Sequence, residues 1–332
     1  MILFCALCFI ALQGASAVTI QTVPIGNPGN ANDPATGNHY GSVAYNYSIG
    51  KYDVTVGQYT AFLNAVAGTD TYGLYNTFMA ADLNVAGIAQ SGSSGRYNYS
   101  VIGSPNHPIA HVTWGGAARF ANWVNNGQPS GSEGPGTTET GAYSLNGAVT
   151  SAALNAVTRS AGATWVLPTE SEWYKAAYYD PVAGHYWNYA TGTNVMPASA
   201  PPGSTPNTAN YRADSGAYAV TGSTIHSSSQ NYLTDVGAYT LSASRYGTFD
   251  QTGDVFQWNE AVVVNGGPTR GIRGGSWNNP GAFLASSEGS SAFPAGEGNF
   301  IGFRLAETPE PSTGVLAILA CGSLWWWRKR FK

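Results

Sequence analysis

The chain has 332 residues, of which only 10% are charged, and its formal net charge is −4 at pH 7. Its 42 glycines and 13% aromatic residues indicate a compact, loop-rich domain, because the aromatic area can form a core; a disordered chain is excluded. Between the two ends, 17 acidic and 10 basic residues leave no basic face, so we expect no nucleic acid among its partners.

The N-terminal end is predicted to be an export signal. Ile2 to Leu12 form an apolar run, and Ala15-Ser16-Ala17 is a small-residue cleavage site. This pattern predicts a signal peptide over residues 1–17, although no Lys or Arg precedes the run; the alternative is a buried core segment. Residues 18–39, rich in Pro, Gly and Asn, are expected to form an irregular lead-in.

Alternation of apolar residues predicts a strand over residues 40–52, followed by a helix. Thr55 is expected to be the N-cap of this helix, and apolar residues continue at helical spacing as far as Val66. Gly68 stands where such a helix would end. A second strand and helix are predicted over residues 107–114 and 116–124.

Two later signals are stronger because each has a specific local chemistry. Asn146-Gly147 between apolar segments is typical of a β-hairpin turn. Thr169 followed by Glu172 predicts a capping box at the start of a third helix.

Two polar pairs have both a functional and a structural interpretation. His107 and His111 have the i, i+4 spacing of helical metal sites, but Pro108 and a strand-like context favour a structural role. Glu170 and Glu172 could form an acid/base pair, but glutamates at a helix start more often cap it and complement its dipole.

Several phrases recur at defined spacing in the second half of the chain: Leu167-Pro168-Thr169-Glu170-Ser171-Glu172-Trp173, Tyr246-Gly247-Thr248-Phe249-Asp250, Gly253-Asp254-Val255-Phe256-Gln257-Trp258, Arg273-Gly274-Gly275-Ser276-Trp277 and Ile301-Gly302-Phe303-Arg304. Together they resemble the formylglycine-generating enzyme family, also called sulfatase-modifying factors. The resemblance implies a variant of the C-type lectin fold. The expected architecture is one loop-rich α+β domain over residues 40–307, with short helices and small antiparallel sheets.

The resemblance also implies an oxidase that holds copper through two cysteines. Those positions are occupied here by Asn279 and Leu284, and the three cysteines of the chain, Cys5, Cys8 and Cys321, lie in its end segments. Copper(I) selects soft thiolates, so we expect no copper and no catalytic residues. The leading interpretation is a non-catalytic binding or structural module; the alternative is an oxidoreductase of the family with atypical site residues.

Calcium is the cofactor that the resemblance leaves open. In the family, a loop holds calcium through side chains at the positions of Asp250 and Gln257 and carbonyls at those of Gly253 and Val255. The alternative is a turn whose carboxylates cap main-chain amides.

A second, weaker calcium site would begin at Asn210 and Tyr211, without an alignable distal carboxylate.

Aromatic loops are the candidate ligand surface for an envelope or matrix polysaccharide or protein, through stacking on sugars; the alternative is core and loop packing. Their residues are Tyr97, Tyr178, Tyr179, Tyr186, Trp187 and Tyr189.

The C-terminal end, residues 308–332, has three parts: Pro309-Glu310-Pro311, fifteen uncharged residues from Thr313 to Trp327, and a basic tail containing Arg328, Lys329 and Arg330. It resembles the PEP-CTERM sorting signal, which exosortase-type transpeptidases recognise and cleave in Gram-negative bacteria. The resemblance implies a transient inner-membrane anchor, then release to the cell surface or extracellular matrix. The alternative is an uncleaved anchor.

Overall fold

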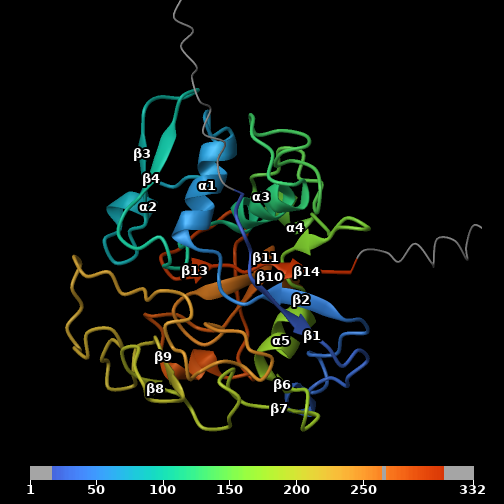
Figure 1. The fold of residues 1–332 in the computed structure, drawn as a ribbon, viewed down its shortest axis with the longest axis vertical. Helices are drawn as coiled ribbons and strands as arrows, with labels where there is room; N and C mark the ends of the chain where they lie inside the picture. The colour runs from blue at the N-terminus through green and yellow to red at the C-terminus, as the bar shows by residue number, and fades with distance from the viewer. Residues whose placement is uncertain (1–16, 264–266, 310–332) are drawn as a thin grey trace, which may run out of the picture.

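The computed structural model describes residues 17–263 and 267–309 (Figure 1). The predicted signal peptide over residues 1–17 lies outside these ranges up to residue 16, and the predicted sorting signal over residues 308–332 lies outside them from residue 310 onward. Within them, no helix has the length and apolar character needed to cross a membrane.

The helices are short and few. They are α1 (Val56–Val66), α2 (Phe78–Ala81), α3 (Trp114–Asn125), α4 (Ser151–Asn155) and α5 (Glu170–Tyr178), with 3-10 turns η1 (Pro34–Thr36) and η2 (Gly281–Leu284). The strands are β1 (Thr22–Ile25), β2 (Tyr47–Gly50), β3 (Ile88–Ser91), β4 (Asn98–Val101), β5 (Trp165–Val166), β6 (Tyr179–Asp180), β7 (His185–Tyr186), β8 (Ala198–Ser199), β9 (Thr208–Ala209), β10 (Phe256–Val263), β11 (Thr269–Arg273), β12 (Ser290–Ala292), β13 (Ile301–Gly302) and β14 (Ala306–Glu307).

Two four-stranded sheets organise the described chain. One has the order β1-β2-β14-β5, and the other has the order β12-β11-β10-β13. Helices α1 and α3 lie at one end of these central strands, whereas β6 to β9 and long loops lie at the other end (Figure 1). The loop-rich α+β architecture is as predicted, although β13 joins β10 in parallel and β8 joins β9 in parallel.

The three predicted helices form where local chemistry favours them. The Thr55 hydroxyl accepts a hydrogen bond from the Gln58 amide at 3.2 Å, and the Gln58 side chain accepts one from the Thr55 amide at 2.9 Å. The same reciprocal pair joins Thr169 and Glu172 at the start of α5. Each capping box satisfies amides that have no partner inside the helix, and so fixes where the helix begins.

Helices α1 and α3 pack their apolar faces together and onto Phe303, which follows β13. Phe120 on α3 stacks on Tyr59 of α1 with ring centroids 5.9 Å apart, and it meets Phe303 edge-on at 5.4 Å. All three rings are buried. This core anchors one end of β10 and β11, from which the polar sites described below project.

Two strand predictions were wrong in extent. Residues 40–46 are not a strand, because the Asn30 side chain holds this segment through Gly41 and Val43. Residues 107–113 form only an isolated bridge at Pro108, since His111 has a φ of 56° that breaks an extended path, and Trp114 already begins α3.

The turn at Asn146-Gly147 forms without a hairpin. Both residues have positive φ, and the Ala148 amide donates to the Leu145 carbonyl at 2.9 Å. The flanking amides bond elsewhere, however: Leu145 donates to the Glu139 carbonyl. The turn chemistry was therefore predicted, but the strand pairing was not.

Candidate functional site

The positions of the family's two cysteines lie after β11, where Asn279 is half-buried and Leu284 is fully buried. Asn279 accepts a hydrogen bond from the Ser276 hydroxyl, and its carbonyl accepts one from the Arg212 amide at 3.1 Å. Leu284 is fully buried and packs with Tyr211. A Cβ placed on Gly275 would lie 2.6 Å from the Leu284 side chain, so an isobutyl group already occupies this space.

The loop predicted to hold calcium is tightly turned, with positive φ at Asp250, Gly253 and Asp254. One oxygen of Asp250 accepts a hydrogen bond from the Gly237 amide at 2.7 Å, and no described residue donates to the other. Burial raises the pKa of Asp250 to about 6, with the Gly237 hydrogen bond and the Arg304 charge opposing it. Asp250 therefore keeps one oxygen that a hard cation could bind.

Gln257 does not fit as a calcium ligand in this arrangement. Its oxygen accepts from Trp173 Nε1 and from Arg304 Nε, both at 2.6 Å, and neither of these groups can accept a hydrogen bond. The amide orientation is thereby fixed, and Gln257 Nε2 donates to the Asp250 carbonyl at 2.7 Å. The residue turns a donor toward the loop where a calcium ligand would need an oxygen.

Calcium at this loop stays a prediction, and it would draw on Asp250 with the carbonyls of Gly253 and Val255. Groups of the second predicted site are also engaged in hydrogen bonds within the protein. The Asn210 amide donates to the Tyr232 carbonyl at 2.7 Å, and the Tyr211 carbonyl accepts the Ser199 hydroxyl at 2.6 Å.

Asp254 is a buried carboxylate that the motif did not single out. It accepts hydrogen bonds from Asn210 Nδ2 at 2.9 Å and from the Thr234 hydroxyl at 2.7 Å. Burial, the largest cause, raises the pKa of Asp254 to about 7, and the nearby Asp250 adds to the rise. Asp254 ties the two predicted loops together.

A fully buried ion pair joins Arg304 to Asp53 at 3.1 Å. Burial raises the pKa of Asp53 well above its usual range and lowers that of Arg304, while each charge opposes the shift of the other. Asp53 Oδ2 has no hydrogen-bond partner in the described part of the chain. The pair is held in place at the cost of removing both charges from water.

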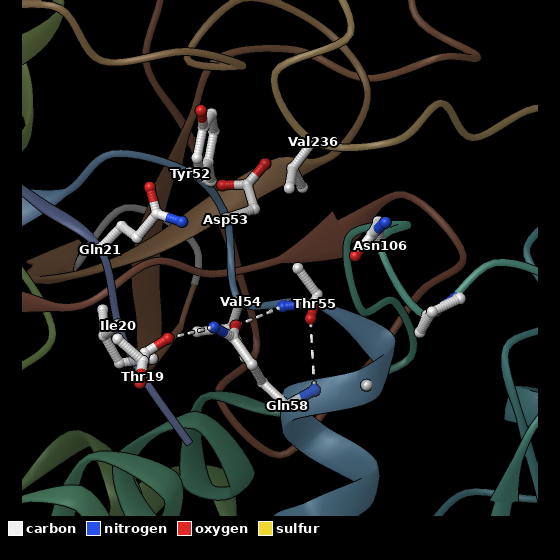
Figure 2. A pocket seen from close by; sticks show the side chains of 12 residues that line it. Thr19, Ile20, Gln21, Tyr52, Asp53, Val54, Thr55, Gln58, Asn106 and Val236 are labelled. Carbon is white, nitrogen blue, oxygen red and sulfur yellow. Dashed lines mark hydrogen bonds between the residues drawn. The ribbon is translucent and has the colours of Figure 1, made fainter. Parts of the chain in front are cut away.

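Asp53 also borders a groove of about 430 Å³ at the start of α1, which Figure 2 shows from close by. Gln58 reaches across one side and donates to the Thr19 carbonyl at 2.9 Å. The remaining lining residues are uncharged, and Asp53 itself is only 2% exposed. The groove therefore presents no charged group to solvent.

The predicted pair Glu170 and Glu172 does not act together, because each glutamate contacts a different arginine. Glu172 completes its capping box and accepts Arg159 Nη2 at 2.9 Å. Burial alone would raise the pKa of Glu172, but Arg159 outweighs burial and the pKa is lowered. Glu170 contacts Arg273 Nε and also accepts Asn259 Nδ2 at 2.6 Å.

The predicted histidine pair is separated. His111 Nε2 lies 3.3 Å from an Asp82 oxygen, whereas His107 Nε2 lies 3.7 Å from Asp235. The two rings face different partners, and the part of the chain that the structure describes contains no group of three or more His, Cys, Asp or Glu able to hold a metal ion.

The aromatic residues proposed as a sugar surface are mostly packed. Tyr178 is fully buried and meets Trp173 edge-on, while Tyr179 packs on Tyr186 with centroids 4.9 Å apart. The remaining three, Tyr97, Trp187 and Tyr189, are half-buried.

Sequence reasoning missed the ion pairs because their partners are far apart along the chain. Glu170 and Arg273 are separated by 103 positions, and Asp53 and Arg304 by 251. A signal was present, since an arginine in an otherwise buried strand such as β11 requires a carboxylate or carbonyl partner.

Comparisons with known proteins concern most of the chain. Residues 16–309 match a family profile described as a sulfatase-modifying factor enzyme 1-like domain. No curated protein matches.

Among solved structures, one described as the crystal structure of CarF is 20% identical, with a TM-score of 0.54, over 89% of this chain and 100% of that chain. Treponema denticola variable protein 1 is 19% identical with a TM-score of 0.49, over 89% of this chain and 98% of its own. PvdO from Pseudomonas aeruginosa is 17% identical with a TM-score of 0.43, over 87% and 92%. At these identities the likeness to CarF supports the fold alone.

Proposed function

This chain belongs to the family of sulfatase-modifying factor enzyme 1-like domains, and we propose that it is a member without the family's thiolate chemistry, working as a binding or structural module. One observation carries the proposal: the two cysteine positions hold Asn279, bonded to Ser276, and Leu284, fully buried against its neighbours. Neither side chain can supply a thiolate to copper(I).

The sulfur chemistry left in the described residues supports the same proposal. Met79 is buried, and Met196 is 39% exposed and would lie 2.6 Å from a Cβ on Gly281, so it packs beside η2. Thioethers are weak ligands compared with thiolates. The alternative, an oxidase with atypical ligands, would need a polar cluster around Asn279; its hydrogen-bond partners there are Ser276 and the Arg212 amide.

Export and surface sorting form the second part of the proposal. The small-residue cleavage site before Val18 and the tripartite end from residue 308 support secretion, transient anchoring in the inner membrane, and processing by an exosortase-type transpeptidase. Intact-mass measurement on material from a host with that enzyme tests this part. Loss of residues 1–17 and of the basic tail is expected; retention of the tail would contradict sorting.

The decisive test of the non-enzyme proposal is an aldehyde assay. The purified full chain, supplied with copper and oxygen, is incubated with a sulfatase-type cysteine peptide, and an aldehyde-specific label is measured. We expect no labelled peptide, because neither Asn279 nor Leu284 supplies a thiolate to hold copper(I). Labelling above a boiled-protein control would overturn the proposal. The double variant Asn279→Cys, Leu284→Cys, assayed for copper binding, reports whether the pocket can still accept the metal.

A further inference from the structure

A second cavity, of about 460 Å³, lies along strands β12, β11 and β10, and its lining includes neither Asn279 nor Leu284. Gly271 of β11, Ala261 and Val263 of β10, and Ser290 and Ser291 of β12 are among the lining residues. In the strand register Ser291 is paired with Gly271, and the missing side chain at Gly271 leaves room for the Asn259 side chain.

The charged part of this cavity is one buried ion pair. The side chain of Arg273 is 2% exposed and that of Glu170 is 15% exposed, and the two are in contact. The other lining residues are uncharged, so the cavity carries both a cation and an anion with no net charge. A charged ligand would be attracted by one partner and repelled by the other, which favours a neutral ligand.

Arg273 has hydrogen-bonding capacity to spare. Its Nη1 donates to the carbonyls of Ser286 at 3.2 Å and Glu288 at 2.6 Å. No acceptor for its Nη2 is found among residues 17–263 and 267–309. Gly289 keeps this nitrogen uncovered, since a Cβ there would lie 3.3 Å from Nη2.

The acceptor beside it is rigidly positioned. Glu170 is held by Arg273 and by Asn259, which can reach it only because residue 271 is glycine: a Cβ at Gly271 would lie 2.4 Å from Asn259 Oδ1. Each carboxylate oxygen retains a lone pair after these bonds. Such support keeps a binding group in a fixed geometry.

The lining of the cavity has an apolar part and a part that carries hydroxyl groups. Tyr40, Ala261 and Val263 offer apolar surface, with the Tyr40 ring 4.9 Å from the Arg273 guanidinium, whereas Ser287, Ser290 and Ser291 offer hydroxyls. A saccharide ring has matching surfaces: a C–H face for apolar contact, and vicinal hydroxyls that both donate and accept.

We propose that this cavity binds a neutral saccharide, whose adjacent hydroxyls bond to Arg273 Nη2 and Glu170 while its C–H face packs on Tyr40, Ala261 and Val263. This proposal rests on the proposed binding role of the domain and names its ligand class. The ligand would be a residue of an envelope or matrix polysaccharide.

The test is ligand-observed saturation-transfer NMR on the purified full chain in detergent. The probes are methyl glycosides of glucose, galactose and mannose, with glucuronate, glucosamine and the neutral peptide acetyl-trialanine amide as comparators. Saturation of at least one neutral glycoside, above all three comparators, is expected. No saturation of any neutral glycoside, or stronger saturation of a comparator, would overturn the proposal.

A pair of variants locates the binding. Gly289→Leu directs a side chain at Arg273 Nη2 and is expected to weaken glycoside binding roughly ten-fold or more. Gly203→Leu makes the same change on an exposed loop and should leave binding unchanged. Equal binding by Gly289→Leu would overturn the site.

Ser290→Ala with Ser291→Ala provides a milder variant, in case Gly289→Leu does not fold; it should weaken binding, and unchanged binding would contradict the site. The aldehyde assay on the same preparation separates the two proposals. Labelled peptide would remove the non-enzyme role, whereas absent saturation with no label would remove only the saccharide site.

Discussion

Two buried arginine–carboxylate pairs of this domain differ in what they leave unbonded. In the Arg304–Asp53 pair both side chains are fully buried, and all three guanidinium nitrogens donate to the protein. In the Arg273–Glu170 pair, Nη2 has no acceptor in the described part of the chain and the pair lines a cavity. The first guanidinium joins chain segments; the second keeps a donor available.

The pKa shifts of the two arginines also differ. Burial dominates at Arg304 and lowers its pKa, whereas at Arg273 burial is outweighed by attraction to Glu170 and the pKa is raised. Burying a pair completely costs more than its mutual attraction returns unless other hydrogen bonds compensate. A pair at a cavity wall keeps most of its attraction while remaining accessible to a ligand.

The largest expected effect is therefore at Arg304. Arg304→Met leaves Asp53 buried without a partner and frees the carbonyls of Gly50 and Phe249, so we expect a loss of about 3–5 kcal/mol in the free energy of unfolding. Arg273→Met should lose about 1–3 kcal/mol, because Glu170 keeps Asn259 and some solvent contact. Urea unfolding measures both.

Equal losses for the two arginine variants would contradict the distinction between the two ion pairs. Here the Arg304–Asp53 pair is called saturated, because all its guanidinium nitrogens donate to the protein, and the Arg273–Glu170 pair is called accessible, because it lines a cavity. A matched control is available on the surface: Arg212→Met removes an exposed guanidinium from a loop and should change the free energy of unfolding little.

The Arg304–Asp53 pair also lies near the carboxyls of Asp250 and Asp254, and these two groups predict that the stability of the fold depends on pH. The pKa of Asp254 is raised to about 7 and that of Asp250 to about 6, both mainly by burial. The folded state holds these protons more tightly than the unfolded state, so stability is greatest below pH 4 in this respect and falls as pH rises to about 7.

Asp254→Asn should remove much of that fall, giving a gain of about 2 kcal/mol at pH 8 relative to the native chain and little change at pH 4. Asparagine tolerates the positive φ of 63° at this position. Denaturant unfolding across pH measures the effect, with the exposed Asp214→Asn as control. A parallel pH profile for Asp254→Asn and the native chain would refute the assignment.

A smaller effect is expected at Gln257, which Arg304 and Trp173 hold with its amide nitrogen toward the Asp250 carbonyl. Gln257→Glu replaces that donor by an oxygen, which repels the carbonyl without a cation and completes a calcium site with one. Calcium should therefore raise the melting temperature of the variant by about 2–4 °C more than that of the native chain.

Thermal unfolding in chelator and in millimolar calcium checks this difference, and Gln257→Met, which cannot ligate calcium, is the control. The same calcium response in the native chain and in Gln257→Glu would show that the amide does not limit binding at this loop.

What the sequence could predict depended on how far apart along the chain the interacting residues lie. The starts of α1 and α5 were predicted because Thr55 meets Gln58, and Thr169 meets Glu172, within three positions. The strand over residues 107–114 failed because a positive φ at His111 is set by contacts that no local pattern reveals.

The ion pairs of the candidate site were missed for the same reason, the separation of their partners along the chain. Phrases containing Arg273 and Arg304 indicated the fold by resemblance, but their partners Glu170 and Asp53 come from distant segments. Which arginine keeps an unused donor depends on the neighbouring glycine at position 289, and this only the packed structure reveals.

The smallest expected effect concerns an exposed pair, Arg245 and Asp180, whose charged atoms lie 3.5 Å apart. The Arg245 side chain is 49% exposed, so water screens the attraction and Arg245→Gln should cost about 0.5 kcal/mol or less. Asp180 accepts backbone amides from Val182 and Ala183, and those bonds, the Ala183 bond first, lower its pKa without Arg245. Urea unfolding in low and high salt should give nearly the same small difference. If Arg245→Gln lowers the free energy of unfolding as much as Arg304→Met or Arg273→Met does, the contribution of an arginine charge would not depend on burial. The contrast between the Arg304–Asp53 and Arg273–Glu170 pairs would then have no physical basis.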